Sequence, residues 1–280
     1  MSVAVVTDTA GSLTPELAAE WGVRLVPLTV IVDGQTYRDT EIGPEALSSG
    51  RATTAGPAPG DFLAALRDAP DGAVIVTVAA SLSSTNGAAR MAASLSDVPV
   101  EVVDSTSASG AQALVARAAV DRAAEGGDLR AVADAARAAA GDVHIVGCLS
   151  DLEGLARSGR VPGLAAGAVR RSGVRFMFRL QDGKIRLTKP AASDASAMNR
   201  IVQACVQSAK PGLVADLVLL GETAALAERV NRAVDDGRLA VGRRFTGTFG
   251  TAITLYTGPH VTGLAWRWRP ASAPSPHHTH

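Results

Sequence analysis

The first half of the chain alternates short apolar runs with helical patterns, and this alternation constrains the fold more than any other feature. Runs rich in β-branched residues predict strands at 3–8, 73–79 and 100–104. The helical patterns cover residues 13–22, 60–69, 84–94, 107–125 and 128–140. Such alternation is typical of a mainly parallel sheet with helices on both faces. We therefore expect an α/β fold with an α/β/α arrangement in this half.

Local signals mark where some of these elements begin and end. Thr14 is suited to the N-cap of the first helix and Gly22 to its end. The apolar run 23–32 reads as one strand and ends at Asp33-Gly34, which predicts a hairpin. The order of elements in this half is therefore set by local sequence alone.

The second half mixes hairpins with helices and predicts a second domain. A strand begins at 143, a hairpin turns at Asp182-Gly183, and two strands close the chain. Helices are expected at 151–159, 194–208 and 223–236. We place the domain boundary near residue 142. The prediction is an N-terminal domain over 1–142, a C-terminal α/β domain with a mixed or antiparallel sheet over 143–270, and a disordered Pro- and Ser-rich tail over 271–280.

Composition disfavours several classes of protein. Lys plus Arg equals Asp plus Glu at 27 each, so no basic excess indicates a nucleic-acid partner. No apolar run approaches the roughly 20 residues of a membrane span, and no signal segment opens the chain, so we expect a cytoplasmic protein. Two lone cysteines, Cys148 and Cys205, argue against disulfides and zinc sites. Hydrophobic residues make up 47% and aromatic residues only 4%, which predicts a core of Ala, Val and Leu.

Polar side chains follow three of the expected strands where those strands end. The clusters are 7–9, 81–85 and 104–107, and a fourth at 53–54 precedes a helix. In open α/β sheets, ligands bind at the carboxyl ends of strands beside helix N-termini. The alternative is that each hydroxyl only caps its helix. Four clusters at one edge favour a pocket of neutral donors for an anion, with these residues at its rim: Asp8, Ser84, Thr85 and Ser105.

No motif predicts catalysis by this chain. The nucleophile elbow GxSxG and the phosphate loop GxxxxGK[ST] are absent, and only His144 and His260 lie in the expected folded body. A serine without a positioned base is a weak nucleophile, so hydrolysis is a minor alternative. No metal-binding pattern is present, and no metal or cofactor is expected. A second alternative is an enzyme acting on a small phosphorylated or carboxylated metabolite at the sheet rim.

Several short motifs occur in a fixed order from residue 3 to residue 264. They are "VTDTAGSL", "LVPLTVIVDGQTYRD", "TTAGPAPGDF", "SLSSTNGA", "VVDSTSASGAQALV" and "DLEGLARSGRV". Each is modest alone, but together they resemble the DegV family of bacterial fatty-acid-binding proteins. The resemblance puts Thr54 at that family's ligand-contacting threonine and Ser83 at its carboxylate-contacting serine.

The chain also departs from the family pattern. Ser84 replaces a glycine, and Phe178 stands where the family has a proline. In "YTGPH", Tyr256 occupies the position of a carboxylate-contacting histidine, whereas an alternative register would bring His260 there. The fatty-acid carboxylate is therefore expected to contact residues of this set: Thr54, Ser83, Tyr256 or His260.

The resemblance implies two domains with a long-chain fatty acid between them. It also implies that the protein is the binding subunit of a fatty acid kinase, which presents the carboxylate to a separate ATP-dependent kinase and carries the acyl phosphate to phospholipid synthesis. The implied protein is a non-catalytic lipid carrier. The sequence leaves open the chain length of the lipid, the identity of the kinase and the oligomeric state, a monomer included. A run of arginines predicts either a kinase-docking face or a solvated surface: Arg157, Arg160, Arg170, Arg171 and Arg175.

Overall fold

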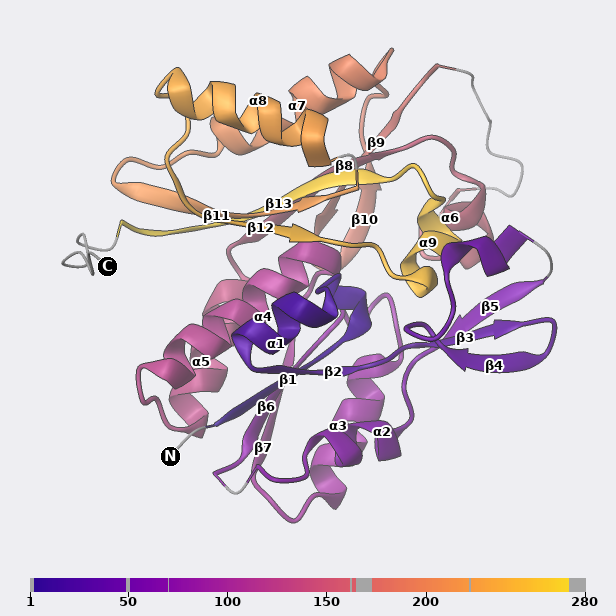
Figure 1. Cartoon of the computed structure of the whole chain (residues 1–280), viewed down its shortest axis with the longest axis vertical. Coiled ribbons are helices and arrows are strands. Elements are labelled where there is room, and N and C mark those ends of the chain that lie inside the picture. Colours follow the sequence, from indigo (N-terminus) through magenta and orange to yellow (C-terminus); the bar gives the residue numbers. More distant parts are fainter. Residues whose placement is uncertain are drawn as a thin grey trace.

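The computed structural model describes residues 3–48, 51–69, 71–161, 163–164, 173–221 and 223–271. Strands of these residues form two main sheets and a small third one, and helices fill the space between and around them (Figure 1). The predicted fold class is confirmed: the protein is α/β, with a parallel sheet from the first half of the chain and a mixed sheet from the second.

The first sheet has four parallel strands in the order β2-β1-β6-β7. Its strands are β1 (Ala4–Asp8), β2 (Val23–Val26), β6 (Ala73–Thr77) and β7 (Val100–Asp104). The helices of this half are η1 (Thr9–Gly11), α1 (Pro15–Trp21), η2 (Pro44–Ser48), α2 (Pro59–Ala65), α3 (Thr85–Leu95), α4 (Ser109–Ala124) and α5 (Leu129–Ala140). Thr14 caps α1 by accepting from Leu17 N at 3.1 Å, and Gly22 ends it in a left-handed conformation, as predicted.

The second sheet has six strands in the order β10-β9-β8-β13-β11-β12. All neighbours are antiparallel except β11 and β12, which are parallel. Its strands are β8 (Val143–Leu149), β9 (Phe176–Gln181), β10 (Lys184–Leu187), β11 (Leu213–Leu220), β12 (Val241–Gly247) and β13 (Thr262–Pro270). The helices of this half are α6 (Glu153–Ser158), α7 (Asp194–Gln207), α8 (Thr223–Asp235) and α9 (Thr251–Thr257).

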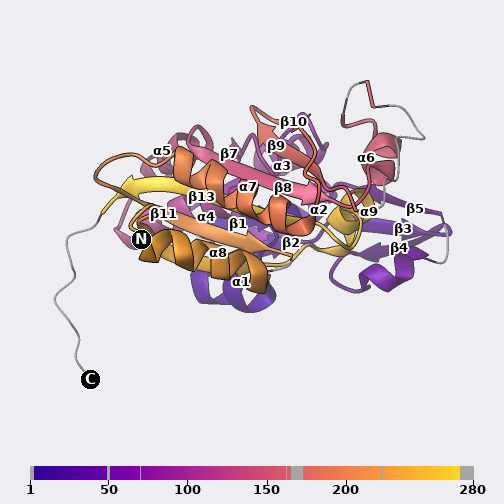
Figure 2. The same cartoon turned by 90° about the horizontal axis from the view of Figure 1, so that it is seen from above.

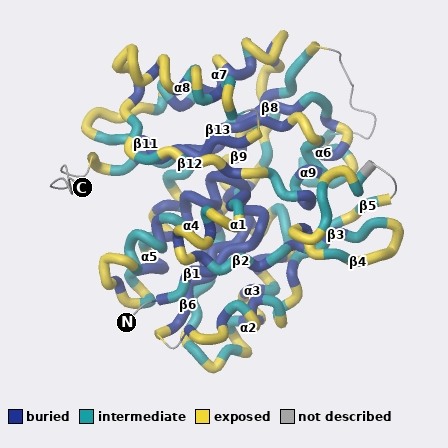
Figure 3. The backbone as a smooth tube through the Cα atoms, in the orientation of Figure 1, coloured by how far each residue is buried: buried dark blue, intermediate teal, exposed yellow. Residues whose placement is uncertain are grey.

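The layers alternate from one side of the molecule to the other (Figures 1 and 2). Helices α7 and α8 cover the outer face of the six-stranded sheet, and its inner face rests on α4. Helices α1, α4 and α5 cover one face of the four-stranded sheet, and α2 and α3 cover the other. Helix α4 therefore packs against both sheets, and its first eight residues are all buried (Figure 3).

The apolar run 23–32 is not the single strand that its pattern predicts. It splits at Pro27 into β2 of the first sheet and β3 (Thr29–Val32) of a separate small sheet with β4 (Gln35–Arg38) and β5 (Ala52–Ala55). Proline has no N–H to donate to a strand neighbour, so the ladder stops there. The hairpin between β3 and β4 is confirmed, with Asp33 and Gly34 both at positive φ.

Three further features of the fold bear on the predictions made from the sequence. Helix α9 was not predicted from the sequence, and its seven residues pack against α6 and η2. The domain boundary near residue 142 stays a prediction, although the first strand of the second sheet starts at Val143. Residues 272–280 of the tail lie outside the described part of the chain.

Among the described residues, no helix combines the length and apolar character needed to span a membrane.

Gly110 allows α4 to approach the six-stranded sheet closely. A Cβ at this position would lie 2.8 Å from Val218 Cβ and 3.1 Å from Ala265 Cβ. We expect Gly110→Ala to lower the free energy of unfolding by about 1–3 kcal/mol, because overpacking exceeds the gain from replacing a helical glycine. Urea unfolding followed by circular dichroism measures this.

Gly87 in α3 provides the matched control. A Cβ there would meet no atom within 4 Å. Gly87→Ala should therefore raise the free energy of unfolding by about 0.5–1 kcal/mol, the usual gain for glycine to alanine in a helix. Equal effects at the two positions would contradict the role assigned to Gly110.

Candidate functional site

A narrow cavity of about 120 Å³ lies between the two main sheets, at the N-terminal end of α4. Its walls are mostly aliphatic and aromatic. The first half of the chain contributes Ala10, Leu28, Val78, Leu82 and Ala108 to them. The second half contributes Ile145, Leu155, Phe178, Leu180, Ile185 and Phe249. None of the described residues that line this cavity carries a carboxylate. The cavity therefore suits an apolar chain and repels no anion by a charge of its own.

Polar side chains from both halves meet at this cavity. The hydroxyls of Thr54 on β5 and Tyr256 on α9 are hydrogen-bonded to each other. The guanidinium carbon of Arg160 lies 4.1 Å from the centroid of the Tyr256 ring, in a cation–π contact. Arg160 Nε also donates to Leu82 O at 2.8 Å. Hydroxyl donors and one cation thus stand together beside an apolar wall.

Ser83 joins this group at the N-terminal end of α3. Its Oγ lies 2.8 Å from Thr85 Oγ1 and accepts from Thr85 N at 3.3 Å. Gly56, which directly follows β5, lies against the same turn, since a Cβ there would be 3.0 Å from Thr85 Oγ1 and 3.1 Å from Ser84 Oγ. The absence of a side chain at Gly56 therefore lets β5, and with it Thr54, come close to the start of α3.

Asp8 does not line the cavity but holds the backbone of two residues that do. Its carboxylate accepts from Val78 N at 2.8 Å and from Ala10 N at 3.1 Å, and both of those residues line the cavity. Asp39 lies nearby and accepts from Thr9 Oγ1 at 2.8 and 2.9 Å. Burial raises the pKa of each carboxyl group to about 6. These two acids fix the loops that shape one wall.

The structure separates the predicted site residues into two groups. Thr54, Ser83 and Tyr256 line the cavity. His260 is exposed and does not line it. The four predicted rim residues do not line it either: Asp8, Thr85 and Ser105 are buried, and Ser84 is exposed. Ser105 instead satisfies the backbone of its own loop, since its Oγ accepts from Ser107 N and donates to Ser107 O, each at 3.1 Å.

Arg160 was missed as a site residue by sequence reasoning. Its neighbours in the arginine-rich stretch have other partners, because Arg157 pairs with Glu153 and Arg175 with Asp194. Arg170 and Arg171 lie outside the described residues. Only the fold brings Arg160 to the Tyr256 ring. The sole sequence signal was its place in "DLEGLARSGRV". In the described part of the chain, no group of three or more His, Cys, Asp or Glu side chains is arranged to hold a metal ion.

Comparison with known proteins agrees with this architecture. The profile of a family described as "Uncharacterised protein, DegV family" matches residues 2–268. The chain belongs to the DegV family. A DegV domain-containing protein of Mycobacterium tuberculosis is 31% identical over 271 residues, which cover 94% of this chain and 96% of that protein. One from Streptomyces coelicolor is 27% identical over 94% of this chain and 97% of its own length.

Solved structures of other DegV proteins share the fold. A DegV family protein of Thermus thermophilus, described as binding fatty acid, superposes with a TM-score of 0.81 at 27% identity, covering 95% of this chain and 99% of its own. The fatty acid kinase B3 protein of Streptococcus pneumoniae, loaded with linoleic acid, gives a TM-score of 0.82 at 19% identity and the same coverage. At that identity the second likeness establishes the fold alone.

The two buried acids predict how stability depends on pH. A folded-state pKa near 6, above the ordinary aspartate pKa of 3.8, means that the folded protein binds more protons than the unfolded chain between these values. The free energy of unfolding should therefore fall as pH rises from about 4 to about 7, by up to roughly 3 kcal/mol per group. Urea unfolding at pH 5 and pH 7.5 tests this.

Replacing Asp39 identifies the source of the effect. Asp39→Asn keeps an oxygen that can accept from Thr9 Oγ1 but removes the titrating group. The difference between pH 5 and pH 7.5 should shrink in this variant. A profile as steep as that of the wild type would show that Asp39 does not contribute to it.

Proposed function

We propose that this protein binds a long-chain fatty acid in the cavity between its two sheets and presents the carboxylate to a partner ATP-dependent fatty acid kinase. The observation that carries the proposal is the cavity itself, an apolar space with Thr54, Ser83, Tyr256 and Arg160 on its lining. The fatty acid described for the Thermus thermophilus relative supports the same ligand class. The chain acts as a carrier in this proposal and supplies no catalytic group.

The apolar walls supply most of the affinity in this proposal. Burial of a chain of roughly 16 carbons, at about 0.8 kcal/mol per methylene, contributes on the order of 11 kcal/mol before the costs of association and ordering. A hydroxyl bonded to the head group adds only about 0.5–1.5 kcal/mol. Walls from both halves of the chain surround the lipid, so binding also holds the two sheets together.

The polar group orients the carboxylate. The hydroxyls of Thr54, Ser83 and Tyr256 can each donate one hydrogen bond to it. Arg160 adds a cation, whose hydrogen bonds to a charged partner are about twice as strong as neutral ones. His260 is exposed and takes no part in this arrangement. The Thr54–Tyr256 hydrogen bond would open so that both hydroxyls turn to the ligand.

Transfer of phosphate requires a second protein in this proposal. The fatty acid kinase B3 protein of Streptococcus pneumoniae, which carries linoleic acid, has the same fold and motivates the kinase as partner. Thr54 is half-buried, so the head-group end of the cavity lies near the protein surface. A kinase could reach the carboxylate there while the tail stays covered. ATP-dependent transfer of this kind places both proteins in the cytoplasm.

Native mass spectrometry of the purified protein tests the ligand class directly. We expect a co-purifying fatty acid, and saturable binding of a fluorescent fatty acid after delipidation. Ile185→Asp puts a charge in the apolar wall and should weaken that binding at least tenfold. Leu95→Asp, at a residue 62% exposed and away from the cavity, is the matched control and should bind as the wild type does. A delipidated wild type that binds no fatty acid would refute the proposal.

The head-group residues should differ in their effects on affinity. Arg160→Met should weaken fatty-acid binding about 10- to 100-fold, because it removes a charge-assisted contact of about 1.5–3 kcal/mol. Tyr256→Phe should weaken it about 2- to 10-fold, the value of one neutral hydrogen bond. His260→Ala serves as the control. If only the His260 change weakens binding, the carboxylate lies elsewhere.

Kinase-dependent phosphorylation of the bound lipid separates presentation from binding. Ser83→Ala combined with Thr54→Ala should slow acyl-phosphate formation by an added bacterial fatty acid kinase more than it weakens lipid binding, because orientation is lost while the apolar contacts remain. The measurement follows acyl phosphate formed at saturating fatty acid. A double variant that is phosphorylated at the wild-type rate would contradict the assignment of these two hydroxyls.

A further inference from the structure

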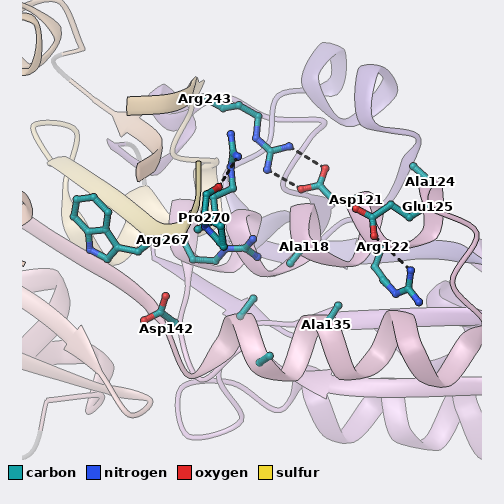
Figure 4. Close-up of a pocket in the computed structure, with 14 residues that line it drawn as sticks. Ala118, Asp121, Arg122, Ala124, Glu125, Ala135, Asp142, Arg243, Arg267 and Pro270 are labelled. Carbon is teal, nitrogen blue, oxygen red and sulfur yellow. Dashed lines mark hydrogen bonds and ion pairs between the residues drawn. The ribbon is translucent and has the colours of Figure 1, made fainter. Parts of the chain in front are cut away.

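A second and larger pocket lies at the opposite end of α4 from the lipid cavity. Its volume is about 720 Å³, and it opens between the C-terminal part of α4, helix α5 and the ends of β12 and β13 (Figure 4). Both halves of the chain contribute to it. The lipid cavity begins at Ala108 and Ser109, whereas this pocket is lined by residues 118, 121, 122 and 124 of the same helix and by its C-cap, Glu125. The two spaces share no lining residue.

Small side chains keep this pocket open. Ala118 and Ala124 come from α4, and Ala135, Ala138 and Ala139 come from α5. Figure 4 shows Ala118 and Ala135 on neighbouring helices, with the space between these helices next to Arg267. The pocket therefore combines methyl groups from both helices with charged groups from α4, β12 and β13.

The charged groups of the pocket are paired, with one exception. Asp121 accepts two hydrogen bonds from Arg243, at 2.7 and 2.9 Å. Glu125 pairs with Arg122 at 3.4 Å (Figure 4). Asp142 pairs with Lys210 at 3.2 Å. Arg267 alone among the charged lining residues has no hydrogen bond or ion pair to any part of the chain that the structure describes.

The sheet explains why Arg267 has no partner. Asp216 stands opposite Arg267 in the pairing of β11 and β13 and is 2% exposed. Its two oxygens are already taken, by Arg243 at 2.6 Å and by Arg269 at 2.9 Å. Burial lowers the pKa of Arg267, against the attraction of Asp216 and Asp121. A half-buried guanidinium with five donors is therefore left facing an open pocket.

We propose that this pocket is a binding site for a small organic anion, whose carboxylate or phosphate group pairs with Arg267 and whose apolar part lies against the alanines of α4 and α5. A planar guanidinium matches either group in a two-point contact. An anion fits better than a cation, because every carboxylate of the lining already has a basic partner. The bound anion touches both halves of the chain and should stabilise their contact.

Three probes test the site: inorganic phosphate, benzoate, and benzamidine as a cation with the shape of benzoate. Binding is measured on the lipid-loaded protein by isothermal titration and by ligand-observed NMR, so that the fatty-acid cavity is filled. We expect saturable binding of phosphate or benzoate and none of benzamidine. The tighter of the two anions identifies the group that the site prefers. No saturable binding of either anion would overturn the proposal.

Two variants locate the binding, each with a matched control. Arg267→Gln removes the charge and should weaken binding at least tenfold, whereas Arg244→Gln, at an exposed arginine of β12, should not. Ala138→Leu fills the pocket from α5 without touching any charge and should also weaken binding. Ala224→Leu, at an exposed alanine of α8, is its control. Wild-type affinity in both Arg267→Gln and Ala138→Leu would place the anion elsewhere and refute the site.

Discussion

The structure depends on one helix, α4, which packs against both main sheets at once. Residues 109–116 are buried on every side of the helix, and almost all of them are small or aliphatic. A helix buried all round must be narrow if sheets are to close on it from both sides, and Gly110 gives the closest approach, to Val218 and Ala265. A larger side chain at Gly110 would therefore push α4 away from the six-stranded sheet. The relative position of the two halves follows from this helix.

Much of the fold could be predicted from local sequence, because the decisive signals are local. Period-two and helical patterns identify the strands and helices, and Thr14, Gly22 and Asp33-Gly34 mark ends through their own backbone preferences. The third sheet could not be predicted in this way. Whether β3 continues β2 or starts a new sheet depends on its partners β4 and β5, and Pro27 is the only local sign of the break. Helix α9 could not be predicted for a similar reason, since its position is set by contacts with α6 and η2.

The candidate site shows the same division between local and long-range information. Hydroxyl clusters at strand ends are visible in the sequence, but which of them face a cavity is not. Asp8 and Ser105 turn inward and satisfy backbone groups, whereas Thr54 faces the cavity and reaches Tyr256, 202 residues away. Arg160 joins the group through a ring contact that no spacing predicts. Burial and pairing partners decide a polar residue's role here, and both belong to the tertiary structure.

The two spaces at the ends of α4 are linked through the sheets that enclose it. The cavity at the N-terminal end of α4 lies between walls from both halves, so any separation of the two sheets at that end would widen it. At the far end of the helix, Arg243 of β12 ties the second sheet to α4 through Asp121, and Asp216 of the neighbouring strand β11 holds the same guanidinium. The Arg243–Asp121 pair is bidentate and only partly exposed, and charge-assisted hydrogen bonds of this kind are about twice as strong as neutral ones, whereas the wall at the cavity rests on apolar contacts and one hydroxyl pair. The ion-pair end is therefore the firmer one. Separation of the walls should begin at the end where Thr54 meets Tyr256, which is also where the carboxylate is proposed to lie.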